Sequence, residues 1–294
     1  LEHLRSVPHN GDARQAFWSL AVGDSNLVRI RFQLQDTTAA AADELMQSPT
    51  KMTREQFERI PAFIRETLLF PFSLGERFCQ VLHEKDRWTS VNDALAAPPW
   101  TTAEVLHPEL YLAEEGFKSE QFERFDGMGS VGGVTPIWDD VAGELRVALL
   151  LNQSNFLQRM AGLGQPDILD MPELVSKGIE HFAERPGSQA AAGWLGDRFF
   201  VYPGEGDDTH VYWRSKWTNA EEAKEFAAAI RKALAFRHKI DLPGDGGWAG
   251  GEGRHVKVAL LPEDEVLVID AADADFGRKL EANFNSPQAA EENP

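Results

Sequence analysis

The residues that could do chemistry in this chain are scattered. A zinc hydrolase typically carries two histidines four residues apart on one helix, with a glutamate between them. No two of the eight histidines have this spacing: His3, His9, His83, His107, His181, His210, His238 and His255. The single cysteine, Cys79, excludes an intramolecular disulfide and a cysteine-based zinc cluster. We interpret it as a small core residue rather than a nucleophile, and we predict no catalytic residue, metal ligand or cofactor in this chain.

One glycine motif resembles a nucleotide-binding loop. Residues 127–132 read Gly-Met-Gly-Ser-Val-Gly and match the G-x-G-x-x-G pattern of dinucleotide-binding loops. Such a loop binds a pyrophosphate only where a strand leads into it and a helix begins from it. Residues 123–126 and 134–136 predict neither element. We therefore interpret the motif as a flexible loop and not as a nucleotide site.

The string His107-Pro108-Glu109 allows two interpretations. In the functional one, the imidazole and the carboxylate exchange protons near neutral pH or bind a ligand. In the structural one, Thr101 caps a helix that Pro108 terminates, and His107 stabilises the negative end of that helix. We favour the structural interpretation, in which His107 bonds to backbone carbonyls or packs under the next loop.

Aromatic residues gather toward the C-terminal third: Trp194, Phe199, Phe200, Tyr212, Trp213 and Trp217. They could line a ligand groove. Because they lie on segments that predict alternating strands, we interpret them as core.

Composition excludes several classes of partner. The 294 residues carry a formal net charge of −18 and 43% hydrophobic residues, which is typical of a globular protein of two or three domains. This negative charge argues against binding to nucleic acid or to an anionic membrane surface. No apolar run reaches the roughly 20 residues of a membrane span. We expect no transmembrane segment in this chain.

Short helices are predicted for the first two thirds of the chain, and capping-box pairs indicate helix starts both there and in the last third. Capping-box pairs predict helix starts at Asp12 with Gln15, Thr53 with Gln56, Ser73 with Glu76, Thr101 with Glu104 and Thr218 with Glu221. Pro71 should end the second of these helices, and prolines 98 and 99 should end a helix over residues 88–97. Residues 113–137 predict a loop, and helices are expected over 139–151 and 172–183. Residues 26–35 fit a helix and a strand about equally well.

The C-terminal third predicts two strand-strand-helix units. In the first, strands at 198–202 and 210–217 precede a helix at 218–234. After a glycine-rich linker at 241–253, strands at 256–260 and 266–269 precede a helix at 273–280, and residues 288–294 form an acidic tail. This order is what a split α+β sandwich requires. We predict an α+β protein with a helical region at 1–112, a loop and helices at 113–196 that complete the first domain, and an α+β domain at 197–294.

Residues 10–235 also resemble a known family. The strings that carry the resemblance include residues 60–72 (IPAFIRETLLFPF), 101–109 (TTAEVLHPE), 143–145 (GEL) and 190–197 (AAAGWLGD), and the segment around His107-Pro108-Glu109 is the most specific of them. They are similar to a family of bacterial zincin-like metallopeptidases, many of them uncharacterised. The resemblance favours helix for residues 26–35 and is compatible with an extracytoplasmic location, although the sequence leaves the compartment open.

The resemblance implies a zinc site that this sequence does not carry. Members of the family have an H-E-x-x-H helix and, further on, an acidic ligand just before a Gly-Asp pair. Here Gly23-Asp24 is preceded by Val22, which cannot bind a metal, and the H-E-x-x-H helix has no counterpart. We therefore expect a noncatalytic binding or scaffolding protein whose partner is a protein or peptide. The alternative is an active zinc peptidase whose H-E-x-x-H segment lies upstream or on a separate chain.

Overall fold

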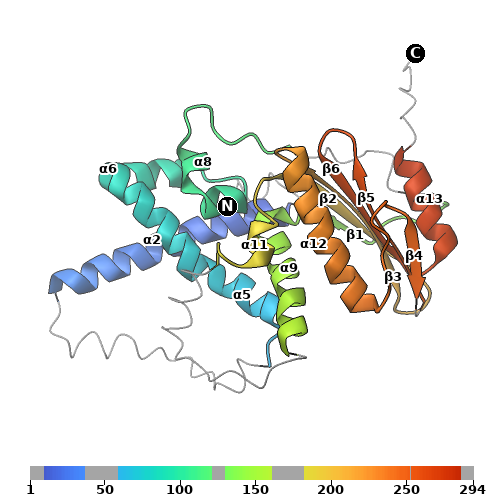
Figure 1. Cartoon of the computed structure of the whole chain (residues 1–294). Helices are drawn as coiled ribbons and strands as arrows, with labels where there is room; N and C mark the ends of the chain where they lie inside the picture. Colours follow the sequence, from blue (N-terminus) through green and yellow to red (C-terminus); the bar gives the residue numbers. More distant parts are fainter. Residues whose placement is uncertain (1–9, 37–58, 121–129, 161–181, 252, 286–294) are drawn as a thin grey trace, which may run out of the picture. The chain divides into compact units, whose positions relative to one another are not determined.

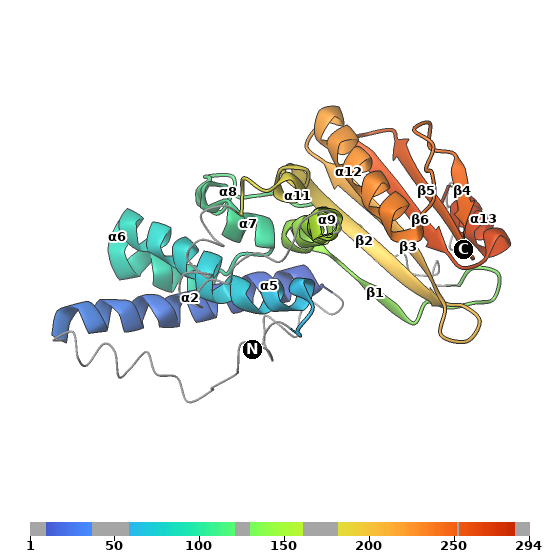
Figure 2. The same cartoon turned by 60° about the horizontal axis from the view of Figure 1, so that its bottom comes forward.

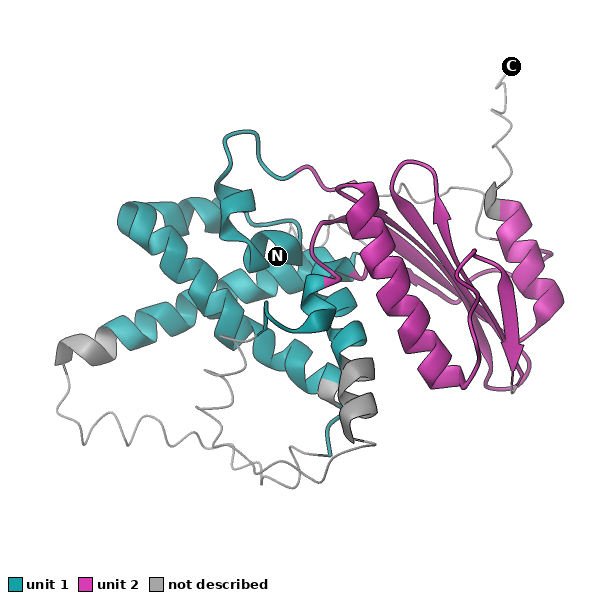
Figure 3. Cartoon of the chain, in the orientation of Figure 1, with its two compact units in different colours: residues 1–117, 143–189 teal, residues 118–142, 190–294 magenta. Residues whose placement is uncertain are grey.

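The chain forms two compact units, each assembled from two separate stretches of sequence. A computed structural model describes residues 10–36, 59–120, 130–160, 182–251 and 253–285 (Figure 1). Unit 1 comprises residues 1–117 and 143–189, and unit 2 comprises residues 118–142 and 190–294 (Figure 3). The fold class is α+β, because helices build unit 1 and a six-stranded antiparallel sheet forms the centre of unit 2. Within these described ranges, no helix is long and apolar enough to cross a membrane.

Unit 1 is helical. Its elements are α2 (Gly11–Asp36), α5 (Ala62–Phe70), the π-helical turn η1 (Pro71–Gly75), α6 (Glu76–Ala96), α7 (Thr102–Leu106), α8 (Pro108–Leu112), α9 (Gly143–Met160) and α11 (Pro186–Gln189). Residues 26–35 lie within α2, as predicted, and buried Leu20 and Leu27 on this helix belong to the core. The cap of α2 is Asn10 rather than Asp12, since Asn10 Oδ1 accepts from Ala13 N at 2.9 Å. The side chain of Asp12 is bonded elsewhere.

The helical run α5–η1–α6 passes alongside α2 without a break at its proline (Figure 2). The prediction that Pro71 ends a helix was wrong, because Pro71 begins the π-helical turn and the chain continues as a helix through it. The expected helix start at Ser73 was also wrong. The hydroxyl of Ser73 donates to the carbonyl oxygens of Leu69 (3.1 Å) and Phe70 (3.2 Å), which supports the wider turn.

A glycine pair marks the place where α2 meets η1. A Cβ atom on Gly23 would lie 2.2 Å from the carbonyl oxygen of Gly75, and a Cβ on Gly75 would lie 2.3 Å from the carbonyl oxygen of Ser19. These obstacles are backbone atoms, so no rotamer change can relieve them. The two backbones can approach this closely only because both residues lack a side chain.

Unit 2 is built on one antiparallel sheet of strand order β1-β2-β3-β6-β5-β4. The strands are β1 (Trp138–Asp140), β2 (Trp194–Pro203), β3 (Thr209–Trp217), β4 (Trp248–Gly251), β5 (Arg254–Leu261) and β6 (Glu265–Ala271), and the helices are α12 (Ala220–His238) and α13 (Ala274–Asn285). The central strands β3 and β6 pair from Val211 with Asp270 to Lys216 with Glu265. Both strand-strand-helix units are present, and they share this sheet.

The two helices of unit 2 cover opposite faces of the sheet, as Figure 1 shows. Side chains alternate between faces along a strand. On β3, Trp213 contacts Phe226 of α12 with ring centroids 5.4 Å apart, whereas Tyr212 belongs to a core cluster with Leu280 of α13. All seven residues of β6 are therefore buried.

Five further predictions differ in detail or lie outside the described residues. The glycine-rich segment 241–253, predicted as a linker, contains the edge strand β4. The helix predicted over 139–151 begins only at Gly143, because β1 takes up the preceding residues. The predicted helix start at Thr53, residues 172–181 of the helix predicted over 172–183, and residues 127–129 of the glycine motif all lie outside the described ranges. Gly132, the last residue of that motif, and Gly133 have positive φ in a tight turn.

Candidate functional site

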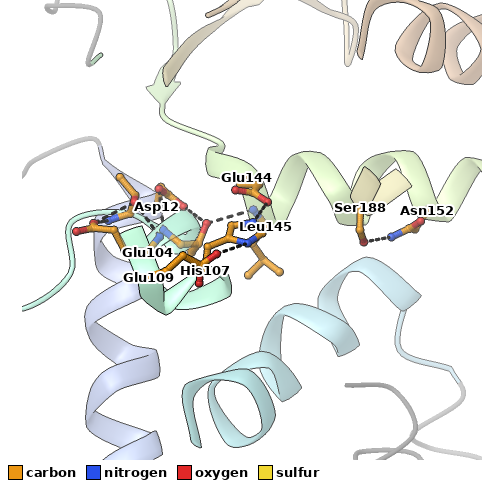
Figure 4. Close-up of polar contacts among 10 residues, drawn as sticks. Asp12, Glu104, His107, Glu109, Glu144, Leu145, Asn152 and Ser188 are labelled. Carbon is orange, nitrogen blue, oxygen red and sulfur yellow. Dashed lines mark hydrogen bonds and ion pairs between the residues drawn. The ribbon is translucent and has the colours of Figure 1, made fainter. Parts of the chain in front are cut away.

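The polar site of unit 1 centres on a histidine–glutamate pair. His107 lies at the junction of α7 and α8, and Glu144 lies in the first turn of α9 (Figure 4). Their closest atoms, His107 Nε2 and Glu144 Oε1, are 2.7 Å apart. The side chain of Glu144 is 6% exposed and that of His107 is 36% exposed, so the pair has one buried end and one end open to solvent. On the open side, Glu109 approaches His107 Nδ1 at 3.9 Å.

The helix starts around this pair are joined by hydrogen bonds. The carboxylate of Asp12, in the first turn of α2, accepts from Thr102 N (3.1 Å) and Thr102 Oγ1 (2.5 Å). The same hydroxyl oxygen accepts from Leu145 N in the first turn of α9 at 3.1 Å. Asp12 and Thr102 thus connect the starts of α2, α7 and α9, and Glu144 lies next to Leu145. Carboxylates in the first turn of a helix are stabilised by its unpaired N–H groups and its dipole.

The predicted capping box at Thr101 is present. Thr101 Oγ1 accepts from Glu104 N, and the Glu104 carboxylate accepts from Thr101 N at 2.9 Å and from Trp100 N at 2.8 Å. Burial raises the pKa of Glu104, and these hydrogen bonds oppose that shift. Pro108 follows the end of α7, as expected, and also begins α8 as its first residue, a position where a missing N–H costs little.

The protonation of the pair is set by two opposed effects. The hydrogen bond to Glu144 raises the pKa of His107, although burial acts in the opposite direction. Burial raises the pKa of Glu144, although the hydrogen bond from His107 lowers it. Each shift favours retention of a proton by the pair. The arrangement can therefore hold a proton near neutral pH and exchange it with solvent through the exposed edge of the imidazole.

Sequence reasoning missed the partner of His107. The expected partner was a backbone carbonyl or the next loop, whereas the side chain bonds to a carboxylate 37 residues away. No spacing rule links positions so far apart, because the fold alone brings α7 and α9 together. The short Gly143-Glu144-Leu145 string belonged to the resemblance, but its sequence context gives it no acid–base role.

The Gly23-Asp24 segment and Cys79 lie close together in unit 1. Burial, reinforced by the nearby carboxylates of Asp24 and Glu76, raises the pKa of Cys79 to about 12. The thiol is fully buried and lies 3.5 Å from the carbonyl oxygen of Leu20, which fits a core residue. Over the described stretches of the chain, no three His, Cys, Asp or Glu side chains form a group that could hold a metal ion.

The polar residues of unit 2 also bind one another. Asp197 is fully buried and accepts from the indole N–H groups of Trp194 (2.9 Å) and Trp213 (3.0 Å) and from Ala142 N (2.9 Å). Asp270 accepts from Arg254 Nε at 2.9 Å and lies 2.8 Å from His238 Nε2. These contacts satisfy buried carboxylates within the sheet unit.

The aromatic set of unit 2 forms core rather than a groove. Trp194, Trp213 and Trp217 are buried, and the last two contact Phe226 of α12. Phe200 and Tyr212 are buried in the cluster on the α13 face. Because a sheet separates the two groups, they do not line one surface.

A comparison with known proteins places half of the chain in a family. Residues 135–281 match the family described as Domain of unknown function (DUF8575). The chain belongs to this family. No curated protein and no solved structure matches the chain. The matched range begins just before β1 and ends within α13, and it includes Glu144 but not His107.

Proposed function

We propose that this chain is a noncatalytic protein that binds a protein or peptide partner, related to zincin-like metallopeptidases through the strings of residues 60–72, 101–109 and 190–197. The observation that carries the proposal is that the buried carboxylates of the two polar clusters described above are bonded to other groups of the chain itself. Asp12 bonds to Thr102, and Glu144 bonds to His107. In unit 2, Asp197 bonds to two indoles.

Carboxylates whose oxygen atoms already accept hydrogen bonds from the protein are typical of structural positions. A catalytic carboxylate needs lone pairs that can reach a substrate or a bound water. The Asp12 carboxylate accepts from both the backbone N–H and the hydroxyl of Thr102, the Asp197 carboxylate accepts from Ala142 N and from two indoles, and both side chains are buried. These carboxylates therefore hold helices and strands in position.

Exposed apolar side chains in each unit support a binding role. On α5 and η1, Ile64, Leu68 and Phe72 follow one another at four-residue spacing and are 48–59% exposed. At the edge of the sheet, Ile137 and Trp138 are 62% and 51% exposed. Aromatic and aliphatic residues of this kind provide the central contacts of many protein interfaces.

The proposal can be tested on the full-length natural product. Zinc content is measured by mass spectrometry and hydrolysis is measured with a mixed peptide library. Peptides selected from a random 12-residue display library are then titrated calorimetrically. We expect no stoichiometric zinc, no hydrolysis, and saturable binding of a selected peptide.

Surface variants locate the binding face. The affinity of the selected peptide should fall at least tenfold in Leu68→Ser or in Trp138→Ser, depending on which unit binds it. Phe236→Ser, at a comparably exposed position on α12, is the control and should leave the affinity unchanged. Stoichiometric zinc together with peptide hydrolysis would contradict the proposal and establish the peptidase alternative.

A further inference from the structure

We propose that His107 and Glu144 form a proton-operated clasp that holds the α7–α8 corner against the start of α9 and loosens as the pH rises above neutral. The clasp is independent of any ligand and therefore of the binding function proposed above. Its geometry is a 2.7 Å contact between one partly exposed and one buried side chain, located where three helix starts are joined.

The clasp joins the corner between α7 and α8 to the first turn of α9. His107 closes α7, where its N–H donates to Ala103 O at 2.8 Å, and it precedes α8, where its carbonyl oxygen accepts from Leu110 N at 2.8 Å. Glu144 belongs to α9. A change at the His107–Glu144 contact therefore acts directly on the corner between the two short helices.

Charged groups from the neighbouring elements bias the clasp. Arg77 of α6 disfavours a charged His107, whereas Glu109 of α8 and Glu144 of α9 favour it. Glu109 also disfavours ionisation of Glu144. From α2 and α7, the carboxylates of Asp12 and Glu104 are already engaged by Thr102 and by Trp100 and Thr101.

The direction of the pH response follows from these charges. With His107 protonated, the buried Glu144 carboxylate has a cation in contact. The pKa of His107 is raised above its usual 6.5 in the folded chain. The resulting stabilisation is therefore complete below pH 6.5 and is lost as the pH rises through the folded pKa. Loss of the proton leaves a buried carboxylate without its counter-charge, which disfavours the closed corner.

Hydrogen exchange on the full chain tests this inference. The amides of His107 and Leu110 report on the corner, and that of Ala97, bonded to Asp93 O at the end of α6, is the internal reference. After correction for intrinsic exchange rates, we expect protection of the two corner amides to fall severalfold between pH 6 and pH 9, because the cation that stabilises the closed corner is lost when His107 is deprotonated. Protection of Ala97 should change much less.

Two variants distinguish a proton switch from a purely structural contact. Glu144→Gln keeps a hydrogen-bonding side chain but removes the charge, and should make protection of the corner independent of pH. Glu109→Gln, at an exposed position, is the matched control and should retain most of the loss. A wild-type profile that stays flat, or a Glu144→Gln profile that still falls, would overturn the proposal. If Glu144→Gln does not fold, the NMR titration of the wild-type His107 ring decides: a midpoint above 6.5 supports the clasp, and one at or below 6.5 overturns it.

Discussion

Replacing Gly23 by alanine should destabilise unit 1, although alanine is the better helix former. The added Cβ would lie 2.2 Å from the carbonyl oxygen of Gly75, 2.4 Å from its carbonyl carbon and 2.9 Å from Glu76 N. An ordinary contact between a methyl group and these atoms needs roughly 3.4 Å or more. Helix α2 would therefore have to move away from η1 by on the order of 1 Å.

Two terms of opposite sign decide the magnitude. Overpacking against backbone atoms that cannot rotate away costs about 2–4 kcal/mol, near or above the upper end of typical values. The gain in helix propensity from Gly to Ala offsets about 1 kcal/mol of this. We expect a net loss of about 1–3 kcal/mol in the free energy of unfolding.

Urea unfolding followed by far-UV circular dichroism measures this loss, and hydrogen exchange of α2 amides assigns it to unit 1. The control is Ser25→Ala, at an exposed position on the same helix, which should change stability by less than about 0.5 kcal/mol. An increase in stability for Gly23→Ala would refute the close backbone contact, because propensity alone would then decide the outcome.

Three more outcomes follow from other contacts. Asp197→Ala should lower the free energy of unfolding of unit 2 by about 3 kcal/mol or more, measured by urea unfolding, because two indole N–H groups and one backbone N–H lose their acceptor. Unit 2 should lose stability as the pH falls below 6.5, because burial lowers the pKa of His210, whose Nδ1 accepts a hydrogen bond from Ala272 N. In thermal unfolding between pH 7 and pH 5, a His210→Gln variant should lose less stability than the wild type. Glu263→Asn should raise the stability of unit 2 by about 0.5–1 kcal/mol in thermal unfolding, because Glu263 has a φ of +60° and asparagine tolerates that conformation better. No gain in stability would show that the turn is unstrained.

Local patterns predicted the sheet unit well. The alternation of residues 210–217 indicates a strand with two different faces, and β3 has Tyr212 and Trp213 on opposite sides of the sheet. The helix after it follows from its apolar spacing, although the side chain that caps it is Asn219 rather than Thr218. These features depend on neighbours within a few residues, which the sequence displays directly.

Features that depend on distant residues could not be predicted in the same way. Pro71 is tolerated inside a helical run because the chain widens to a π-helical turn, and Gly23 of α2 meets Gly75 at the end of that turn. The edge strand β4 is glycine-rich, and its Trp248 indole donates to Glu281 of α13 at 2.9 Å. The His107–Glu144 pair likewise exists only once α7 and α9 are packed. Tertiary contacts decide each of these cases.

The interleaving of the two units has a consequence for synthesis of the chain. Unit 1 lacks α9 and α11 until residue 189 has been made, by which time residues 118–142 of unit 2 have already emerged. Neither unit can complete its core before the other has begun, so an N-terminal domain cannot fold first and release the rest. A recombinant fragment cut at residues 135–281 would carry α9 without α2 and α7, leaving buried Leu145 without the helices that cover it. A fragment that keeps unit 2 intact therefore has ends chosen by unit rather than by family boundary, with a short linker in place of residues 143–189.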